Sequence, residues 1–143
     1  MSSERLILFV SDNAAEAKLC ELILHHKRQD RVILVPCIPE AIRIAVTEHL
    51  PNAIFIDHGY NNAGARLSLY QAIRTLNDGM SIPVVFWRTD MFSTRSQEAI
   101  TLGLSGYIPV VCQPDDIVAA GDAAITGATY FPQINQGQYR KIR

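Results

Sequence analysis

The stretch Ala53-Ile54-Phe55-Ile56-Asp57 decides the fold of this chain, because four consecutive apolar residues end in one carboxylate. An apolar run without alternation is typical of a strand covered on both faces, as in a parallel sheet. A carboxylate at the C-terminal end of such a strand lies where open α/β sheets place their chemistry. Asp12 ends another apolar run, 6–11, in the same way. Two carboxylates at neighbouring strand ends can hold a divalent cation and present one oxygen as a nucleophile.

The same pattern repeats outward along the chain in both directions. Short apolar runs predict five strands at 6–10, 31–35, 53–56, 83–87 and 106–110. Helical patterns lie between them, and their predicted first residues are Asn13 (with Glu16 as capping partner), Pro39, Ala65, Thr94 and Pro114. The third of these helices is expected to stop at Leu76, the fourth before Gly103 and the last at Gly127. Five successive strand–helix units predict an α/β fold, a doubly wound five-stranded parallel sheet with right-handed crossovers.

Composition narrows the class of protein. The 143 residues fit one domain, with 48% hydrophobic and 19% charged residues, which is ordinary globular composition. A net charge of −1 argues against direct nucleic acid contact by this segment, and the absence of a long apolar run argues against a membrane span. Cys20, Cys37 and Cys112 have no CxxC spacing, which predicts free thiols in a cytoplasmic protein. We expect a domain at 1–130 and a linker or tail at 131–143.

Several stretches together resemble a known family. They are Asp12 after the first strand, Asp57 after the third, Gly103-Leu104-Ser105-Gly106-Tyr107-Ile108-Pro109-Val110, Gln113-Pro114-Asp115-Asp116-Ile117 and Gly127-Ala128-Thr129-Tyr130-Phe131-Pro132. In combination they resemble the receiver domain of two-component response regulators over about residues 5–132. The most similar branch has receivers that precede a helix-turn-helix DNA-binding domain. The resemblance implies a flavodoxin-like fold of strand order 2-1-3-4-5 and a regulatory role in a phosphorelay, not an enzyme.

The resemblance also implies a site. Asp57 would accept a phosphoryl group from a sensor histidine kinase or another phosphodonor. Mg²⁺ would be held by Asp12, Asp57 and the backbone carbonyl of Gly59, with Ser11 in the outer shell. Because Ser11 stands where the family has a second acid, we expect Mg²⁺ binding to be weak or absent.

This chain departs from the family at the residues that contact phosphate. Arg88 stands in place of the strand-four Ser/Thr, and Thr89 comes one residue late, which on a strand points to the other face. Val110 stands in place of the strand-five lysine, and the loop after Asp57 lacks the usual proline. A guanidinium can bind carboxylate or phosphate bidentately, so we hypothesise that Arg88 pairs directly with Asp57.

Other roles stay open for some of these residues. Asp12 can serve as a helix N-cap, and Tyr107 matches an aromatic that in the family swings between two rotamers, or it is a half-buried aromatic that does not move. By analogy with the family, the face of helix four, strand five and helix five can form a homodimer, with these candidate residues: Ile100, Leu104, Tyr107 and Val118.

Two functions therefore follow, with a weaker third. The first is a receiver whose phosphorylation at Asp57 shifts the strand four–helix four–strand five face. The alternative is a pseudo-receiver, a phosphorylation-independent module for protein interaction or dimerisation. The third is a flavodoxin-like protein that binds a phosphorylated ligand, against which stands the lack of a glycine-rich loop after the first strand.

Overall fold

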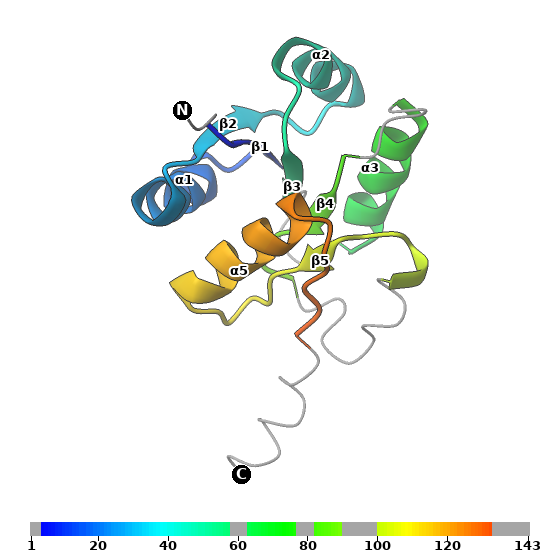
Figure 1. Cartoon of the computed structure of the whole chain (residues 1–143). Helices are drawn as coiled ribbons and strands as arrows, with labels where there is room; N and C mark the ends of the chain where they lie inside the picture. Colours follow the sequence, from blue (N-terminus) through cyan, green and yellow to red (C-terminus); the bar gives the residue numbers. More distant parts are fainter. Residues whose placement is uncertain (1–3, 58–62, 77–81, 90–99, 133–143) are drawn as a thin grey trace.

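Five parallel strands form one sheet in the order β2-β1-β3-β4-β5 in the computed structural model of this chain (Figure 1). The structure describes residues 4–57, 63–76, 82–89 and 100–132. The strands are β1 Leu6–Ser11, β2 Arg31–Val35, β3 Ala53–Asp57, β4 Val84–Phe86 and β5 Gly106–Tyr107. In the parallel register of β1 and β3, Ser11 stands opposite Asp57, so both strands end at the same edge of the sheet. The predicted fold class and strand order are confirmed.

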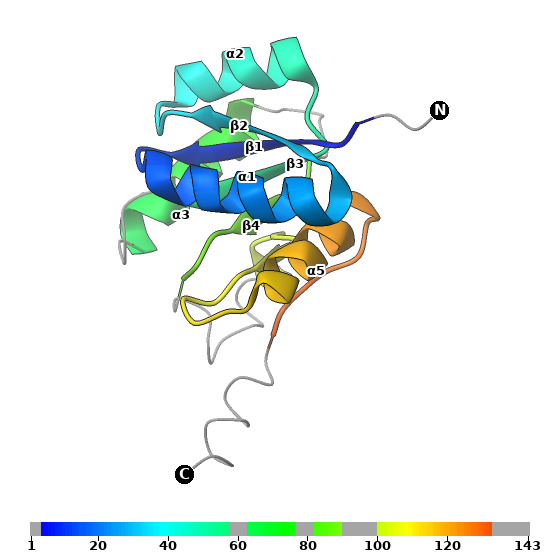
Figure 2. The same ribbon diagram turned by 90° about the vertical axis from the view of Figure 1, so that its left-hand side faces the viewer.

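Helices cover both faces of the sheet. They are α1 Ala14–Arg28, α2 Pro39–His49, α3 Ala63–Leu76 and α5 Pro114–Ile125. Buried side chains of α1 and α5 pack on one face with Phe9, Phe55 and Trp87, and those of α2 and α3 pack on the other with Ile54 and Phe86. Figure 2 shows α1 and α5 in front of the strands. The strands β1, β3, β4 and β5 are therefore buried, which explains their apolar runs, whereas the edge strand β2 is only partly buried.

The helix starts follow local capping rules. Asn13 is the N-cap of α1, and its side chain accepts hydrogen bonds from the backbone N–H groups of Ala15 and Glu16. The expected capping box is only half present, because the Glu16 carboxylate accepts from the indole of Trp87 instead of reaching back to Asn13. Pro39 occupies the first turn of α2, as predicted. Asp12 is not the cap of α1.

Two strands are shorter than predicted, for backbone reasons. β4 ends at Phe86 because Arg88 adopts a left-handed conformation with φ of 44°. β5 spans two residues, although the N–H of Ile108 still donates to Phe86 O at 2.8 Å. Pro109 then has no N–H to continue the ladder. The predicted helix near Thr94 falls mostly on residues 90–99, outside the described part, and residues 100–101 are helical.

The segment after α5 returns to the sheet beside β5. Gly106 pairs with Tyr130 in a parallel bridge, and a Cβ at Gly106 would lie 2.5 Å from Tyr130 O, so this close approach requires glycine. Phe131 packs on Tyr107 with ring centroids 6.2 Å apart. The chain is thus packed against the domain through Phe131, and residues 133–143 of the expected tail lie outside the described residues.

An ionic cluster fastens the start of β1 to the end of α1 and to α5. Arg5 donates to both carboxylate oxygens of the fully buried Asp30, at 2.7 and 2.9 Å. Arg5 and Arg28 also both bind Asp122 on α5. No helix in the described ranges is both long and apolar enough to cross a membrane.

Candidate functional site

Asp57 lies at the C-terminal edge of the sheet, where Ser11 and Arg66 contact it directly. It is the last residue of β3, and 8% of its surface is exposed. The Ser11 hydroxyl donates to Asp57 Oδ2 at 3.0 Å and accepts from the backbone N–H of Asn13 at 2.9 Å. Ser11, expected in an outer shell, is therefore a direct partner of Asp57. The N–H of Asn13 fixes the hydroxyl so that its proton points to the carboxylate.

The cation beside Asp57 comes from α3. Arg66 Nη2 lies 3.4 Å from Asp57 Oδ1, and the Arg66 side chain is 1% exposed. Its guanidinium also lies 5.9 Å from the ring centroid of Phe86 on β4. Arg66 Nε is buried and has no hydrogen-bond partner among the described residues. Asp57 thus forms a buried ion pair with a guanidinium that uses only part of its donor capacity.

Burial opposes charge on both members of this pair. Desolvation raises the pKa of the Asp57 carboxyl, and the Ser11 hydrogen bond and Arg66 oppose that rise. Desolvation also lowers the pKa of Arg66, while Asp57 raises it. Burial thus disfavours charge on both groups, and the partner's charge, together with the Ser11 hydrogen bond to Asp57, offsets part of that effect.

The expected pairing of Arg88 with Asp57 is wrong in this structure. Arg88 Nη1 lies 3.4 Å from Oε1 of Glu16 on α1, and the same oxygen accepts from Trp87 Nε1 at 2.8 Å. The left-handed backbone at Arg88 ends the strand, and the side chain lies against α1 instead of over Asp57. Arg66 contributes the ion pair that was expected from Arg88.

The remaining phosphate-contact candidates lie on β5 or in the segments that follow β4 and β5. Thr89 is buried, and its backbone N–H donates to Ile108 O at 2.8 Å. Val110 is half-buried and provides no polar group. Tyr107 is fully buried against Phe131, which is the inward position, and its swing stays a prediction.

Two carboxylates remain as candidate metal ligands. Asp12 is exposed just beyond β1, and its Oδ1 accepts from the backbone N–H of Cys37 at 3.2 Å. No cluster of three or more His, Cys, Asp or Glu occurs within the described ranges, and Gly59 lies outside them. Two carboxylates fit Mg²⁺, which keeps several waters, but Arg66 competes for Asp57. If Mg²⁺ binds here, Asp12 and Asp57 would hold it, and the ion would offset charge on a phosphoryl group.

The proposed dimer face is mostly buried. Ile100 is 46% exposed, whereas Leu104, Tyr107 and Val118 are 7% exposed or less. These three side chains belong to the core, because the strand and helix faces that carry them pack inward. The expectation that they contribute to a dimer surface is wrong, and Ile100 alone of the four is available.

Arg66 was not predicted from the sequence as a partner of Asp57, because only residues at the ends of strands were considered. One signal in the sequence was available. Arg66 precedes Leu69, Tyr70 and Ile73 at helical spacing, and these three residues are buried on the inner face of α3. That register predicts that Arg66 is buried on the inner face of the helix, but it does not tell which carboxylate the guanidinium meets.

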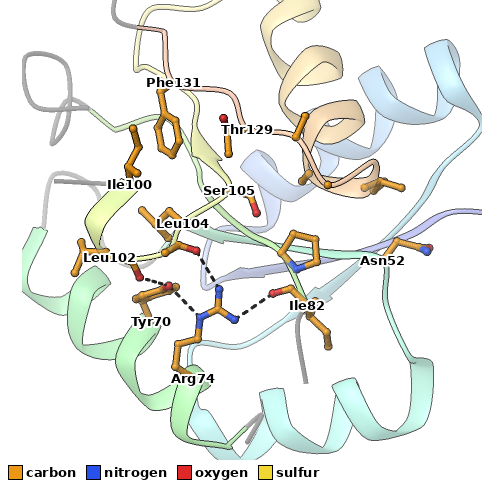
Figure 3. Close-up of a pocket in the computed structure, with 16 residues that line it drawn as sticks. Asn52, Tyr70, Arg74, Ile82, Ile100, Leu102, Leu104, Ser105, Thr129 and Phe131 are labelled. Carbon is orange, nitrogen blue, oxygen red and sulfur yellow. Dashed lines mark hydrogen bonds between the residues drawn. The ribbon is translucent and has the colours of Figure 1, made fainter. Parts of the chain in front are cut away.

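A cavity of about 760 Å³ lies at the opposite end of the sheet, next to the residues that lead into β3, β4 and β5 (Figure 3). Arg74 reaches into it from α3 and donates to Tyr70 Oη, Ile82 O and Gly103 O. These acceptors are all uncharged, and they tie α3 to the starts of β4 and β5. The contacts of Arg74 thus indicate a structural role, away from Asp57.

Comparison with known proteins finds the same fold. No family profile and no curated protein matches the sequence. A two-component response regulator of the LuxR family from Aurantimonas sp. is similar over 99% of this chain and 100% of its own, with a TM-score of 0.74 and 19% identity. The isolated receiver domain of RcsB from Salmonella enterica serovar Typhimurium, determined in the presence of phosphomimetic BeF₃⁻, is also similar. The match covers 94% of this chain and 98% of that one, with a TM-score of 0.72 and 13% identity.

A third similar structure is the receiver domain of NtrX from Brucella abortus. It covers 85% of this chain and 99% of its own chain, with a TM-score of 0.66 and 18% identity. At these identities the similarity establishes the fold, which is that of receiver domains. The similarity does not assign a role to any individual residue of the site.

Proposed function

We propose that this chain is a receiver domain of a response regulator and that Asp57 is its phosphoacceptor. The observation that carries the proposal is a nearly buried carboxylate at the C-terminal end of the central strand β3, beside the end of β1, in a sheet of receiver topology. The proposed partners are a sensor histidine kinase or a small phosphodonor, and a DNA-binding domain elsewhere in the regulator. We place this function in the cytoplasm, as the free thiols suggest.

In the phosphoryl transfer to Asp57, the main contribution of the protein is to position the carboxylate. A carboxylate oxygen of Asp57 attacks the donor phosphorus, the bond from phosphorus to the leaving group breaks, and an acyl phosphate forms. The leaving group departs with the electron pair of the broken bond. Ser11 orients the carboxylate through its hydrogen bond to Oδ2. The domain is modified once and is not itself an enzyme.

The proposed output is a change at β4, β5 and the segment between them. Asp57 on β3 adjoins β4 in the sheet, and β4 pairs with β5. Added charge at Asp57 would therefore first affect the end of β4. The resulting structural change would then extend to the surface around Ile100.

A pseudo-receiver is the second candidate, and specific contacts favour it. Asp57 already has Ser11 and Arg66 as partners, and Arg88 is bound to Glu16 on another element. Such a carboxylate needs no phosphoryl group to be satisfied. In this case the same fold would act as a constitutive interaction module.

Incubation with acetyl phosphate and Mg²⁺, followed by intact mass measurement, separates the two candidates. A receiver gains the mass of one phosphoryl group, which hydroxylamine removes because the product is an acyl phosphate. Asp57→Asn abolishes the adduct, whereas Asp12→Asn retains the acceptor and slows the reaction. Absence of any adduct in excess donor would refute the receiver proposal and favour the pseudo-receiver.

A further inference from the structure

We propose that Arg66 is the phosphoryl-binding cation of this domain, a role that no residue of β4 or β5 fills here. The inference rests on the proposed function of Asp57 and deepens it. It arises from one juxtaposition: a guanidinium that is 1% exposed and lies 3.4 Å from the candidate acceptor, with an unused donor at its Nε.

The unused donor is recognised by comparison with other arginines of the chain. Arg5 and Arg28 each bind an aspartate through Nε and Nη2, the two nitrogens whose hydrogens point in the same direction. Arg66 contacts Asp57 through Nη2 alone. Its Nε is buried without a partner among the described residues. Arg66 therefore uses one of the two donors of such a fork, and its Nε–H is left for a further acceptor.

Phosphorylation of Asp57 would supply an acceptor for the Nε–H of Arg66. An acyl phosphate at Asp57 carries phosphoryl oxygens that can accept the Nε–H, and a planar guanidinium matches phosphate geometry. A phosphoryl group also raises the negative charge at the site. Arg66 is close enough to offset that charge without a large movement of α3.

Among the residues that the structure describes, the other candidates for this role are uncharged or lie elsewhere. Val110 is uncharged, and Arg88 is bound to Glu16 beside α1. Arg74, on the same helix, donates to uncharged groups at the opposite end of the sheet. Of the arginines that the structure describes, Arg66 alone forms an ion pair with Asp57.

A purely structural role is the competing explanation. Arg66 lies over the ring of Phe86, so its removal can alter packing without any effect on phosphate. The test therefore needs variants that separate charge from packing. Arg66→Met keeps the apolar stem, Arg66→Lys keeps the charge but not the fork, and Arg74→Met removes an α3 arginine distant from Asp57.

The full chain is incubated with acetyl phosphate and Mg²⁺, and the initial rate of adduct formation is followed by intact mass. We expect Arg66→Met to lower the rate about ten- to a hundredfold, as for loss of a charge-assisted hydrogen bond. Arg66→Lys should retain an intermediate rate, and Arg74→Met should match the wild type. Thermal melts monitored by circular dichroism show whether each variant is folded.

A rescue variant addresses the role directly. Arg66→Met combined with Val110→Lys places a new cation three residues after β5, where the family resemblance places a lysine, and we expect it to recover about tenfold of the lost rate. Equal rates for wild type and folded Arg66→Met would overturn the assignment of Arg66 while leaving Asp57 as acceptor. A wild type that takes no phosphate would overturn both proposals.

Discussion

Replacing Glu16 by alanine should destabilise this domain far more than its position in the first turn of α1 suggests. Glu16 accepts a hydrogen bond from the indole of Trp87 at 2.8 Å and pairs with Arg88 at 3.4 Å. Trp87 is fully buried and packs edge-on against Phe9 with ring centroids 4.9 Å apart. Truncation of Glu16 therefore leaves a buried indole N–H without its acceptor.

The magnitude follows from three contributions. An unsatisfied buried N–H costs about 1–3 kcal/mol. The Glu16–Arg88 pair, with side chains 29% and 30% exposed, contributes roughly 0.5 kcal/mol after solvent screening. The acidic side chain near the N-terminus of α1 adds about 0.3–1 kcal/mol. We expect Glu16→Ala to lower the free energy of unfolding by roughly 2–4 kcal/mol, with a fall in Tm of about 5–15 °C.

Urea denaturation measures this change directly, because Trp87 is the only tryptophan and its fluorescence reports unfolding. Glu21→Ala on the same helix is the matched control, since the Glu21 side chain is 44% exposed and its ion pair among the described residues is with Lys18 at 3.3 Å. We expect that control to change stability by less than about 0.5 kcal/mol.

A double-mutant cycle with Trp87→Phe, followed by circular dichroism, isolates the coupling between the two side chains. It should be about 1–2 kcal/mol for a hydrogen bond to a charged group. The reasoning fails if Glu16→Ala costs no more than Glu21→Ala, or if the cycle gives no coupling.

Two further predictions concern stability and thiol chemistry. Arg5→Met leaves the fully buried Asp30 without its bidentate partner and should cost about 3–5 kcal/mol in chemical denaturation. Arg31→Met, which breaks an exposed pair, should cost under about 0.5 kcal/mol, and equal losses would contradict this account. Burial raises the pKa of the Cys37 thiol to about 12. Native Cys37 should therefore react with iodoacetamide at pH 8 about a thousandfold more slowly than a thiol of ordinary pKa, and its rate should rise about tenfold per pH unit from pH 7 to 9. A plateau near pH 8.5 in peptide-mapped alkylation would show an unperturbed thiol. The raised pKa stabilises the fold below the ordinary thiol pKa, and this contribution is lost as pH rises toward 12.

Prediction from the sequence succeeded where the signal was local and repeated. The apolar runs around 6–10, 31–35 and 53–56 became β1, β2 and β3 with at most one residue of change. The N-cap at Asn13 and the first-turn position of Pro39 depend on neighbouring residues only, so they too could be predicted directly. The position of Asp57 at the C-terminal edge follows from its strand, because parallel strands end together.

The partners of Asp57, in contrast, were not predicted from the sequence. Family position suggested Arg88, but one left-handed residue placed that side chain against Glu16. Arg66, nine residues after Asp57, approaches the carboxylate because α3 packs its inner face on β3 and β4. Which cation reaches Asp57 thus depends on helix packing and on a single backbone dihedral, and neither is encoded by spacing along the chain.

The sequence by itself determined the sheet, the helices and the position of the acid, since burial patterns and caps are set by residues close in the chain. Only the tertiary structure decided how that acid is held, by Ser11 from β1 and Arg66 from α3, and that the candidate dimer residues Leu104, Tyr107 and Val118 are buried. The physical reason is the distance along the chain over which each kind of interaction acts. Hydrophobic periodicity reports which face of an element is buried, whereas charge pairing in a desolvated site depends on distances of a few ångströms between distant segments.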